Sequence, residues 1–116
     1  MSKLTFFVHG NPVPKQSFRY TKNGGYTDPR MKAWQNEVGW QAKQIGVDAI
    51  TGKVSVKMNF FIQDERKKDL DNLSKSCLDG MKDILFGDDS EVTSLLLTKE
   101  VCKTNPGVMI EIESVD

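Results

Sequence analysis

The feature that most constrains the fold is an alternating segment in the middle of the chain, residues 53–63. Every second residue in it is apolar, namely Val54, Val56, Met58, Phe60 and Ile62. Successive side chains of an extended chain point to opposite faces, so a period of two predicts a β-strand rather than a helix. We therefore expect a strand with one buried face.

A helix is predicted before this strand. It opens at Asp28, a good N-cap residue, followed by Pro29 at the first helical position. It is expected to end near Ile45 and Gly46, where glycine can take the left-handed conformation. Its apolar stripe, at spacings of three and four, consists of Met31, Trp34, Val38, Ala42 and Ile45. Trp40 lies on another face and is a candidate for an interface.

A second helix is predicted after the strand, capped by Asp69 or Asp71 and ending at a break over residues 86–89. Its apolar positions are Leu70, Leu73, Cys77, Met81 and Ile84, with Leu78 beside them. Asp71, Lys75 and Asp79 step by four residues along a different face. The helix therefore buries one stripe and presents a charged one.

Three further strands are predicted, at residues 4–9, 91–102 and 108–113, with a turn at 105–107 and a small hairpin or ordered loop around 23–25. We expect an α+β fold with a small mixed sheet of about four strands and two main helices packed on it. The length suits one domain over residues 1–116.

Composition excludes several classes of protein. No apolar run approaches the roughly 20 residues that span a bilayer, and the alternating N-terminus lacks a signal-peptide cleavage site. We expect a cytoplasmic protein that does not enter a membrane. Cys77 and Cys102 lie far apart without a CxxC pattern, which favours two reduced, buried thiols over a zinc site. His9, the single histidine, is expected to be structural.

The charges are unevenly distributed although they sum to zero. Residues 1–47 carry seven Lys and Arg against two acidic residues, a net charge of +5, and residues 48–116 carry the opposite charge. Such a division suits a polyanion held over a cation-binding site, although uneven surface charge also arises by chance. Within the basic half, Lys15, Arg19 and Lys22 alternate with aromatic residues. This pattern fits contact with nucleic acid, or a loop whose aromatic residues only anchor it.

An acidic cluster is the strongest indication of chemistry. Asp69 and Asp71 come where a strand gives way to a helix, and Asp88 and Asp89 follow that helix. Mg²⁺ prefers carboxylate and water ligands, so the four acids could form one metal site if the chain returns to the same end of the sheet. Lys75, one helical turn after Asp71, would then contact a phosphate.

The same acids also have a plain structural interpretation, as helix caps and solvated turns. We expect Asp79 and Asp83 to have that role. A DxD pair alone is common and is shared with sugar-nucleotide transferases and calcium loops. An EF-hand is excluded because the required third ligand and glycine are missing.

The stretch DLDNLSKSCLDGMKDILFGDDSEV resembles the signature of the RusA family of Holliday junction resolvases: DxDN, a lysine three residues later, an aspartate four beyond it, then a DD-x-x-V segment. The N-terminal third is similar too. It carries a G-x-P-x-P-K opening and a following arginine, with a tyrosine and a proline before the helix, at Gly10, Pro12, Pro14, Lys15, Arg19, Tyr26 and Pro29.

This resemblance implies a homodimeric, Mg²⁺-dependent endonuclease, with Mn²⁺ able to substitute, that cuts four-way DNA junctions by paired incisions. It places the catalytic aspartates on Asp69, Asp71 and Asp89, with Asp88 as the alternative to Asp89, and the essential lysine on Lys75. Lys68 stands where the family has an arginine, which implies contact with a phosphate. Bacteria, phages and prophages encode such enzymes.

Two other functions remain open from sequence: a nuclease acting on forks or flaps, and a junction-binding protein without catalysis. The dimer surface is equally open, with Trp40, Phe61 and Val101 as candidates.

Overall fold

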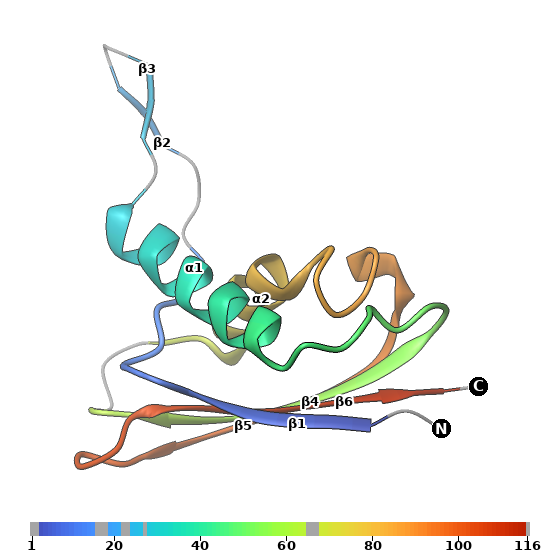
Figure 1. The fold of residues 1–116 in the computed structure, drawn as a ribbon. Helices are drawn as coiled ribbons and strands as arrows, with labels where there is room; N and C mark the ends of the chain where they lie inside the picture. Colours follow the sequence, from blue (N-terminus) through green and yellow to red (C-terminus); the bar gives the residue numbers. More distant parts are fainter. Residues whose placement is uncertain (1–2, 16–18, 22–23, 27, 65–67, 116) are drawn as a thin grey trace.

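The computed structural model describes residues 3–15, 19–21, 24–26, 28–64 and 68–115 (Figure 1). Within these ranges, side chains are described everywhere except at residues 19–21 and 24–26. In chain order the elements are β1 (Lys3–His9), β2 (Arg19–Thr21), β3 (Gly24–Tyr26), α1 (Pro29–Gln44), β4 (Val54–Ile62), α2 (Leu70–Met81), a 3-10 turn η1 (Asp89–Glu91), β5 (Val92–Val101) and β6 (Gly107–Ser114).

Four strands form one mixed sheet in the order β1-β6-β4-β5. β6 pairs antiparallel with both β1 and β4, whereas β5 runs parallel to β4. Parallel neighbours need a crossover connection, and α2 supplies it between β4 and β5. The expected α+β fold, with a four-stranded mixed sheet and two helices, is confirmed.

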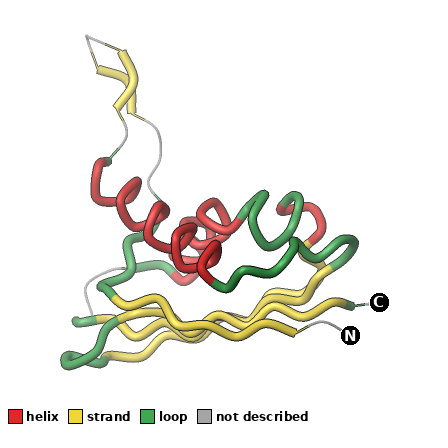
Figure 2. Tube along the Cα trace, in the orientation of Figure 1, coloured by secondary structure: helices red, strands yellow, loops and turns green. Residues whose placement is uncertain are grey.

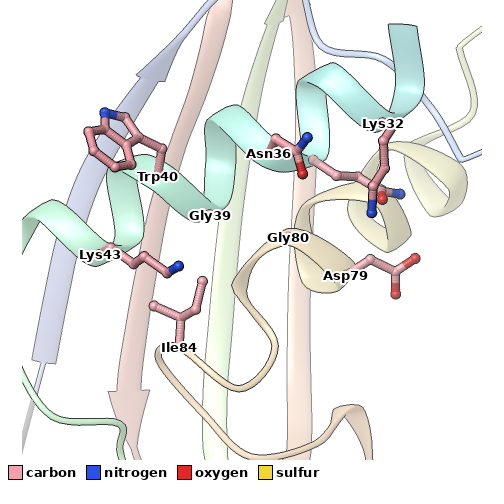
Figure 3. A pocket seen from close by; sticks show the side chains of 9 residues that line it. Lys32, Asn36, Gly39, Trp40, Lys43, Asp79, Gly80 and Ile84 are labelled. Atoms are coloured by element: carbon pink, nitrogen blue, oxygen red, sulfur yellow. The ribbon is translucent and has the colours of Figure 1, made fainter. Parts of the chain in front are cut away.

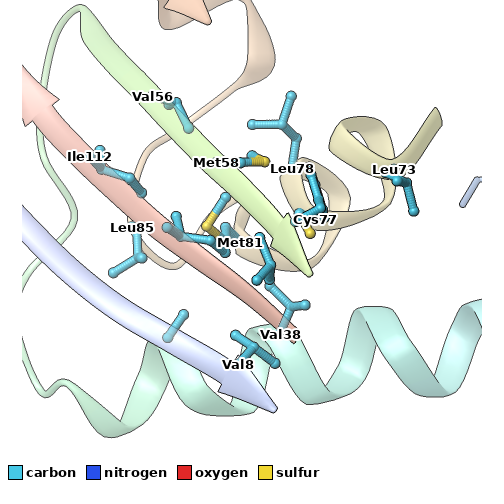
Figure 4. Close-up of a cluster of buried hydrophobic side chains, with 14 of the residues drawn as sticks. Val8, Val38, Val56, Met58, Leu73, Cys77, Leu78, Met81, Leu85 and Ile112 are labelled. Atoms are coloured by element: carbon cyan, nitrogen blue, oxygen red, sulfur yellow. The ribbon is translucent and has the colours of Figure 1, made fainter. Parts of the chain in front are cut away.

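Both helices cover the same face of the sheet (Figure 2). The predicted alternation of β4 is confirmed, because its odd positions face solvent or the sheet's open face while Val54, Val56, Met58, Phe60 and Ile62 are buried. These side chains meet the apolar stripe of α2 and Val8 of β1 in one core cluster (Figure 4). Trp34 lies in this core as predicted, and Trp40 is exposed.

The two helices touch backbone to backbone at a pair of glycines. A Cβ placed on Gly39 would lie 2.8 Å from the carbonyl oxygen of Gly80, and one placed on Gly80 would lie 2.6 Å from the carbonyl oxygen of Gln35. Real Cβ atoms do not approach oxygen so closely, so side chains here would force the helices apart. Glycine at both positions therefore sets the separation between α1 and α2.

α2 is shorter than its apolar pattern predicts. Ile84 continues the stripe in sequence, but the helix ends at Met81 and Asp83 takes a left-handed conformation with φ 66°. The backbone N–H of Asp83 donates to the carbonyl oxygen of Phe86, which closes a tight turn. Asp83, expected only to solvate a loop, thus occupies the position that lets the chain leave the helix.

A small hairpin formed by β2 and β3 stands clear of the sheet and helices beside the start of α1 (Figure 1). Its two strands confirm the hairpin expected around residues 23–25. Its connecting residues 22 and 23 lie outside the described residues.

The other face of the sheet and its β5 edge carry apolar side chains. Phe7 lies 6.1 Å from Phe61, ring centre to ring centre, and contacts His9 edge to face. His9 also pairs with Asn105 at 3.3 Å, in keeping with a structural role. On β5, Leu95, Leu96 and Val101 are exposed. Among the described residues, no helix is both long and apolar enough to cross a membrane.

Candidate active site

Asp69 and Asp71 lie together at the start of α2. Asp69 is the N-cap residue, yet its carboxylate makes no capping hydrogen bond, and its side chain is exposed. Its backbone carbonyl accepts the first helical hydrogen bond, from the N–H of Leu73. Asp71 lies in the first turn, where the positive end of the helix dipole favours a negative charge. The fold therefore presents two carboxylates to solvent at one helix end.

Lys75 is held one turn further along. Its Nζ lies 3.2 Å from Oδ2 of Asp71, an i,i+4 pair in which both side chains are more than half exposed. Exposed pairs of this kind contribute little to stability, about 0.3–0.5 kcal/mol, and exchange partners readily. The ammonium group is therefore placed beside the acids without being fixed to them.

The N-terminal Pro-x-Pro-Lys segment, residues 12–15, is fastened to this helix. The backbone N–H of Lys15 donates to the carbonyl oxygen of Asn72 at 2.8 Å, and Lys15 Nζ lies 2.7 Å from Oδ2 of Asp79. The two motifs that are most distinctive in the sequence are thus neighbours in space. Asp79, expected only to cap or solvate, is the ion-pair partner of Lys15, a contact that sequence spacing could not reveal.

Lys68 precedes the acids but points toward the same segment. Its Nζ donates to the carbonyl oxygen of Pro12 at 2.9 Å, and its own carbonyl accepts from Lys99 Nζ at 2.8 Å. Partial burial lowers the pKa of Lys68, an effect opposed by the nearby charge of Asp64. Lys68 therefore links Pro12, the first residue of this segment, to the start of α2.

Asp88 and Asp89 lie at the opposite end of α2. Asp88 accepts hydrogen bonds from the N–H of Ser90 at 3.2 Å and its hydroxyl at 2.6 Å. Lys82 Nζ is 3.4 Å from the same carboxylate. The hydrogen bonds from Ser90, with help from Lys82, lower the pKa of Asp88 to about 2. Asp89 begins the 3-10 turn and is exposed.

The expected meeting of all four acids is not seen within one chain. α2 has 12 residues, which at about 1.5 Å per residue separate its two ends by about 18 Å. Across residues 3–15, 28–64 and 68–115, no three acidic, cysteine or histidine side chains gather as a metal site would require. The turn after α2 does not gather Asp88 and Asp89 with Asp69 and Asp71 in this chain, and their part in a metal site stays a prediction.

The remaining predicted DNA contacts are only partly visible. Arg19 opens β2, but its side chain is outside what the structure describes, as is all of Lys22.

Cys77 is buried and Cys102 half-buried, both as free thiols.

Two residues of the site, Asp69 and Asp71, are suitable ligands for a magnesium ion. Asp69 and Asp71 offer two exposed carboxylates at the same end of α2, and Mg²⁺ is commonly held by one or two carboxylates, several waters and substrate phosphate. Lys75 adds a positive charge suited to a phosphate. This arrangement can bind and polarise a phosphodiester.

Comparison with known proteins identifies relatives over nearly the whole chain. The family model described as Endodeoxyribonuclease RusA matches residues 9–113. The chain is also similar to the crossover junction endodeoxyribonuclease RusA of Aquifex aeolicus (strain VF5), with 28% identity over 116 residues that cover 97% of this chain and 92% of the relative.

Proposed function

The chain belongs to the RusA family of endodeoxyribonucleases, and from that premise we propose that it is a Mg²⁺-dependent enzyme that resolves four-way DNA junctions by paired symmetric incisions, in recombination and repair. The observation that carries this proposal is the group at the start of α2: Asp69 and Asp71 exposed together, with Lys75 at 3.2 Å from Asp71. Metal-dependent hydrolysis of a phosphodiester uses carboxylates to hold the ion, and a nearby cation stabilises charge on the phosphate.

Each residue has a separate role in the proposed reaction. Asp69 and Asp71 hold Mg²⁺, for which Mn²⁺ can substitute. Bound there, the ion would act as a Lewis acid that polarises a water and offsets charge on the phosphate. Lys75, whose pair with Asp71 is exposed and therefore weak, contacts the scissile phosphate as a positive charge. Lys15, Arg19, Lys22 and Lys68 belong to the proposed DNA-contacting surface.

Asp88 and Asp89 take part, in this proposal, through a second copy of the chain. About 18 Å of helix separates them from Asp69 in one protomer, so a third carboxylate would have to reach the site from a partner. A two-fold dimer also matches a junction that must be cut at two symmetric points. The exposed edge strand β5, with Leu95, Leu96 and Val101, supports the existence of a partner surface, because such edges are usually covered.

Mixing two inactive variants tests this arrangement. Asp71→Asn and Asp89→Asn should each abolish cutting. If each site combines Asp71 of one protomer with Asp89 of the other, a mixed dimer contains one intact site. It should nick the junction once without making the paired cut. No recovery after verified subunit exchange would show instead that each protomer builds its site alone or that Asp89 is not a ligand.

The substrate is tested by comparing a four-way junction, a replication fork, a flap and a linear duplex at matched concentrations. We expect symmetric paired cuts in the junction with Mg²⁺, cuts with Mn²⁺ and none with EDTA. Faster cutting of forks or flaps would favour a different branched substrate. Tight junction binding without any cutting would indicate a catalytically silent protein.

The free thiols and the basic segments suit the cytoplasm of a bacterial or phage-infected cell, the proposed location.

A further inference from the structure

A hollow of about 310 Å³ lies between α1 and α2 on the side of the helix layer that faces away from the sheet (Figure 3). Its floor is the close contact of Gly39 with Gly80. Lys32, Asn36, Trp40 and Lys43 line one wall from α1, and Asp79 and Ile84 line the other. None of these residues except Asp79 has a place in the site described above. We call this hollow the interhelix groove.

The α1 wall is a single exposed stripe. Lys32, Asn36, Trp40 and Lys43 follow one another at spacings of four, four and three, which aligns them along one helix face. Trp40 is 58% exposed, the largest exposed fraction among the large hydrophobic residues that the structure describes. An aromatic ring between two lysines is the pattern that binds a nucleic-acid strand, with ammonium groups on phosphates and the ring on a base.

The charge of the groove is positive. Within the described ranges, neither Lys32 nor Lys43 lies within ion-pair distance of a carboxylate. Among the described residues that line the groove, Asp79 is the one acidic residue, and Lys15 at 2.7 Å already compensates its charge. Both lysines are therefore available to a polyanion, and the wall opposite them does not repel it.

We propose that the interhelix groove is a second contact site for the strand that is cut, in which Lys32 and Lys43 bind phosphates and Trp40 stacks on an unpaired or distorted base. This inference rests on the proposed function, because it assumes a DNA substrate. It adds a binding site on α1 to the acidic site on α2.

The position of the groove relative to the acids fixes which nucleotides it reaches. Asp71, Lys75 and Asp79 form one line along α2, and Asp79 marks the nearer end of the groove beside Lys32 (Figure 3). Eight residues of helix separate Asp71 from Asp79, about 12 Å at about 1.5 Å per residue. A strand rises about 3.4 Å per nucleotide in B-DNA, so the Lys32 end of the groove should reach phosphates three to four nucleotides from the incision.

The first test removes the two charges. Lys32→Gln/Lys43→Gln is compared with a matched double variant, Lys57→Gln/Lys103→Gln, which loses the same charge from exposed positions elsewhere: β4 and the loop after β5. Junction binding is measured in EDTA at several salt concentrations. Each lost phosphate contact should lower the slope of log K against log salt by about 0.9, so the groove variant should lose nearly 2. The control variant should lose much less.

The second test locates the contact on the DNA. Neutral methylphosphonates are introduced one at a time from one to six nucleotides from the incision. At three to four nucleotides the neutral linkage should weaken binding by wild type, and should cause no further loss with Lys32→Gln/Lys43→Gln. Equal sensitivity of the two proteins at every position would overturn the proposal.

The third test concerns Trp40. Trp34 is buried, so quenching of tryptophan fluorescence by bound DNA reports on Trp40. Junction binding should quench the wild type, and Trp40→Phe should remove the quenching while keeping affinity within about threefold, since phenylalanine also stacks. Undiminished quenching in Trp40→Phe would refute stacking at this site.

The two proposals fail in different ways. If wild type cuts junctions but the groove variant matches the control in affinity and salt slope, the groove inference is wrong and the proposed function stands. If wild type binds junctions through the groove but never cuts with Mg²⁺, the proposed function is wrong and the groove inference stands.

Discussion

Lys15 Nζ lies 2.7 Å from Oδ2 of Asp79, a contact between residues 64 positions apart in the chain. It joins the Pro-x-Pro-Lys segment to the helix face that carries Asp71 and Lys75. It also compensates the negative charge of Asp79 at the end of the interhelix groove. One ion pair thus connects the acidic site, the N-terminal motif and the groove.

We predict a small but measurable coupling between these two residues. Both side chains are partly exposed, so a double-mutant cycle of Lys15→Gln and Asp79→Asn should give about 0.5–1 kcal/mol in urea unfolding. The coupling should weaken as salt rises, because the screening length falls to about 3 Å at 1 M. A coupling of zero at low salt would contradict the contact.

Gly80→Ala should destabilise the protein although alanine is the better helix former. Propensity alone predicts a gain of about 1 kcal/mol. The new Cβ, however, would lie 2.6 Å from the carbonyl oxygen of Gln35, and overpacking of this kind costs about 1–3 kcal/mol. Thermal and urea unfolding measure the balance. Gln44→Ala, at an exposed position of α1, is the control and should change the free energy of unfolding by less than about 0.5 kcal/mol. A stabilised Gly80→Ala would contradict the close crossing of the helices.

Asp28 should contribute a pH-dependent part of the stability. Its Oδ1 accepts from the N–H of Arg30 at 2.9 Å, and this hydrogen bond, with the charge of Arg30, holds the pKa of Asp28 below its ordinary value of 3.8. A depressed pKa in the folded state means that the contribution is complete above pH 3.8 and is lost as pH falls through the lower, folded-state pKa.

The matched variant is Asp28→Asn, which keeps a capping oxygen without a titrating group. The difference in free energy of unfolding between wild type and Asp28→Asn should be constant above about pH 5 and should shrink as pH falls below 3.8. A difference that grows in acid would have the wrong sign for this assignment.

The two thiols should differ sharply in reactivity. Burial raises the pKa of the Cys77 thiol to about 12, so almost no thiolate forms at neutral pH, whereas Cys102 is half-buried. A thiol reagent should label one cysteine in the native protein and the second only on unfolding. Cys102→Ser should remove the native reaction, and rapid labelling of that variant would contradict the burial of Cys77.

The sequence predicts the helices and strands of this fold because the spacing of their apolar residues shows which side of each element is buried. The alternation of Val54 to Ile62 and the capped, amphipathic α1 carry their own signals, and the structure follows both within one or two residues. The end of α2 is different. Ile84 continues the apolar stripe, but the chain forms a turn there instead of another helical turn. The turn is closed by the hydrogen bond from Asp83 to Phe86, and it buries Leu85 and Phe86 in the core.

The candidate site likewise has a part that the sequence could predict and a part that it could not. The grouping of Asp69, Asp71 and Lys75 follows from helical spacing and could be predicted. The distance of Asp88 from Asp69 depends on where α2 ends and which way the chain then turns. The contacts of Lys15 with Asp79 and of Lys68 with Pro12 join segments more than 50 residues apart, beyond the reach of any periodicity.

The most direct test of the central claim is the cutting of a synthetic four-way junction by Asp71→Asn in Mg²⁺, beside wild type. Asp71 is exposed and in contact with Lys75, so the substitution should leave folding and junction binding within about threefold of wild type. Wild type should cut and the variant should give no incised product. Cutting by the variant at the wild-type rate would remove Asp71 from the site and contradict the assignment of the active centre to the start of α2.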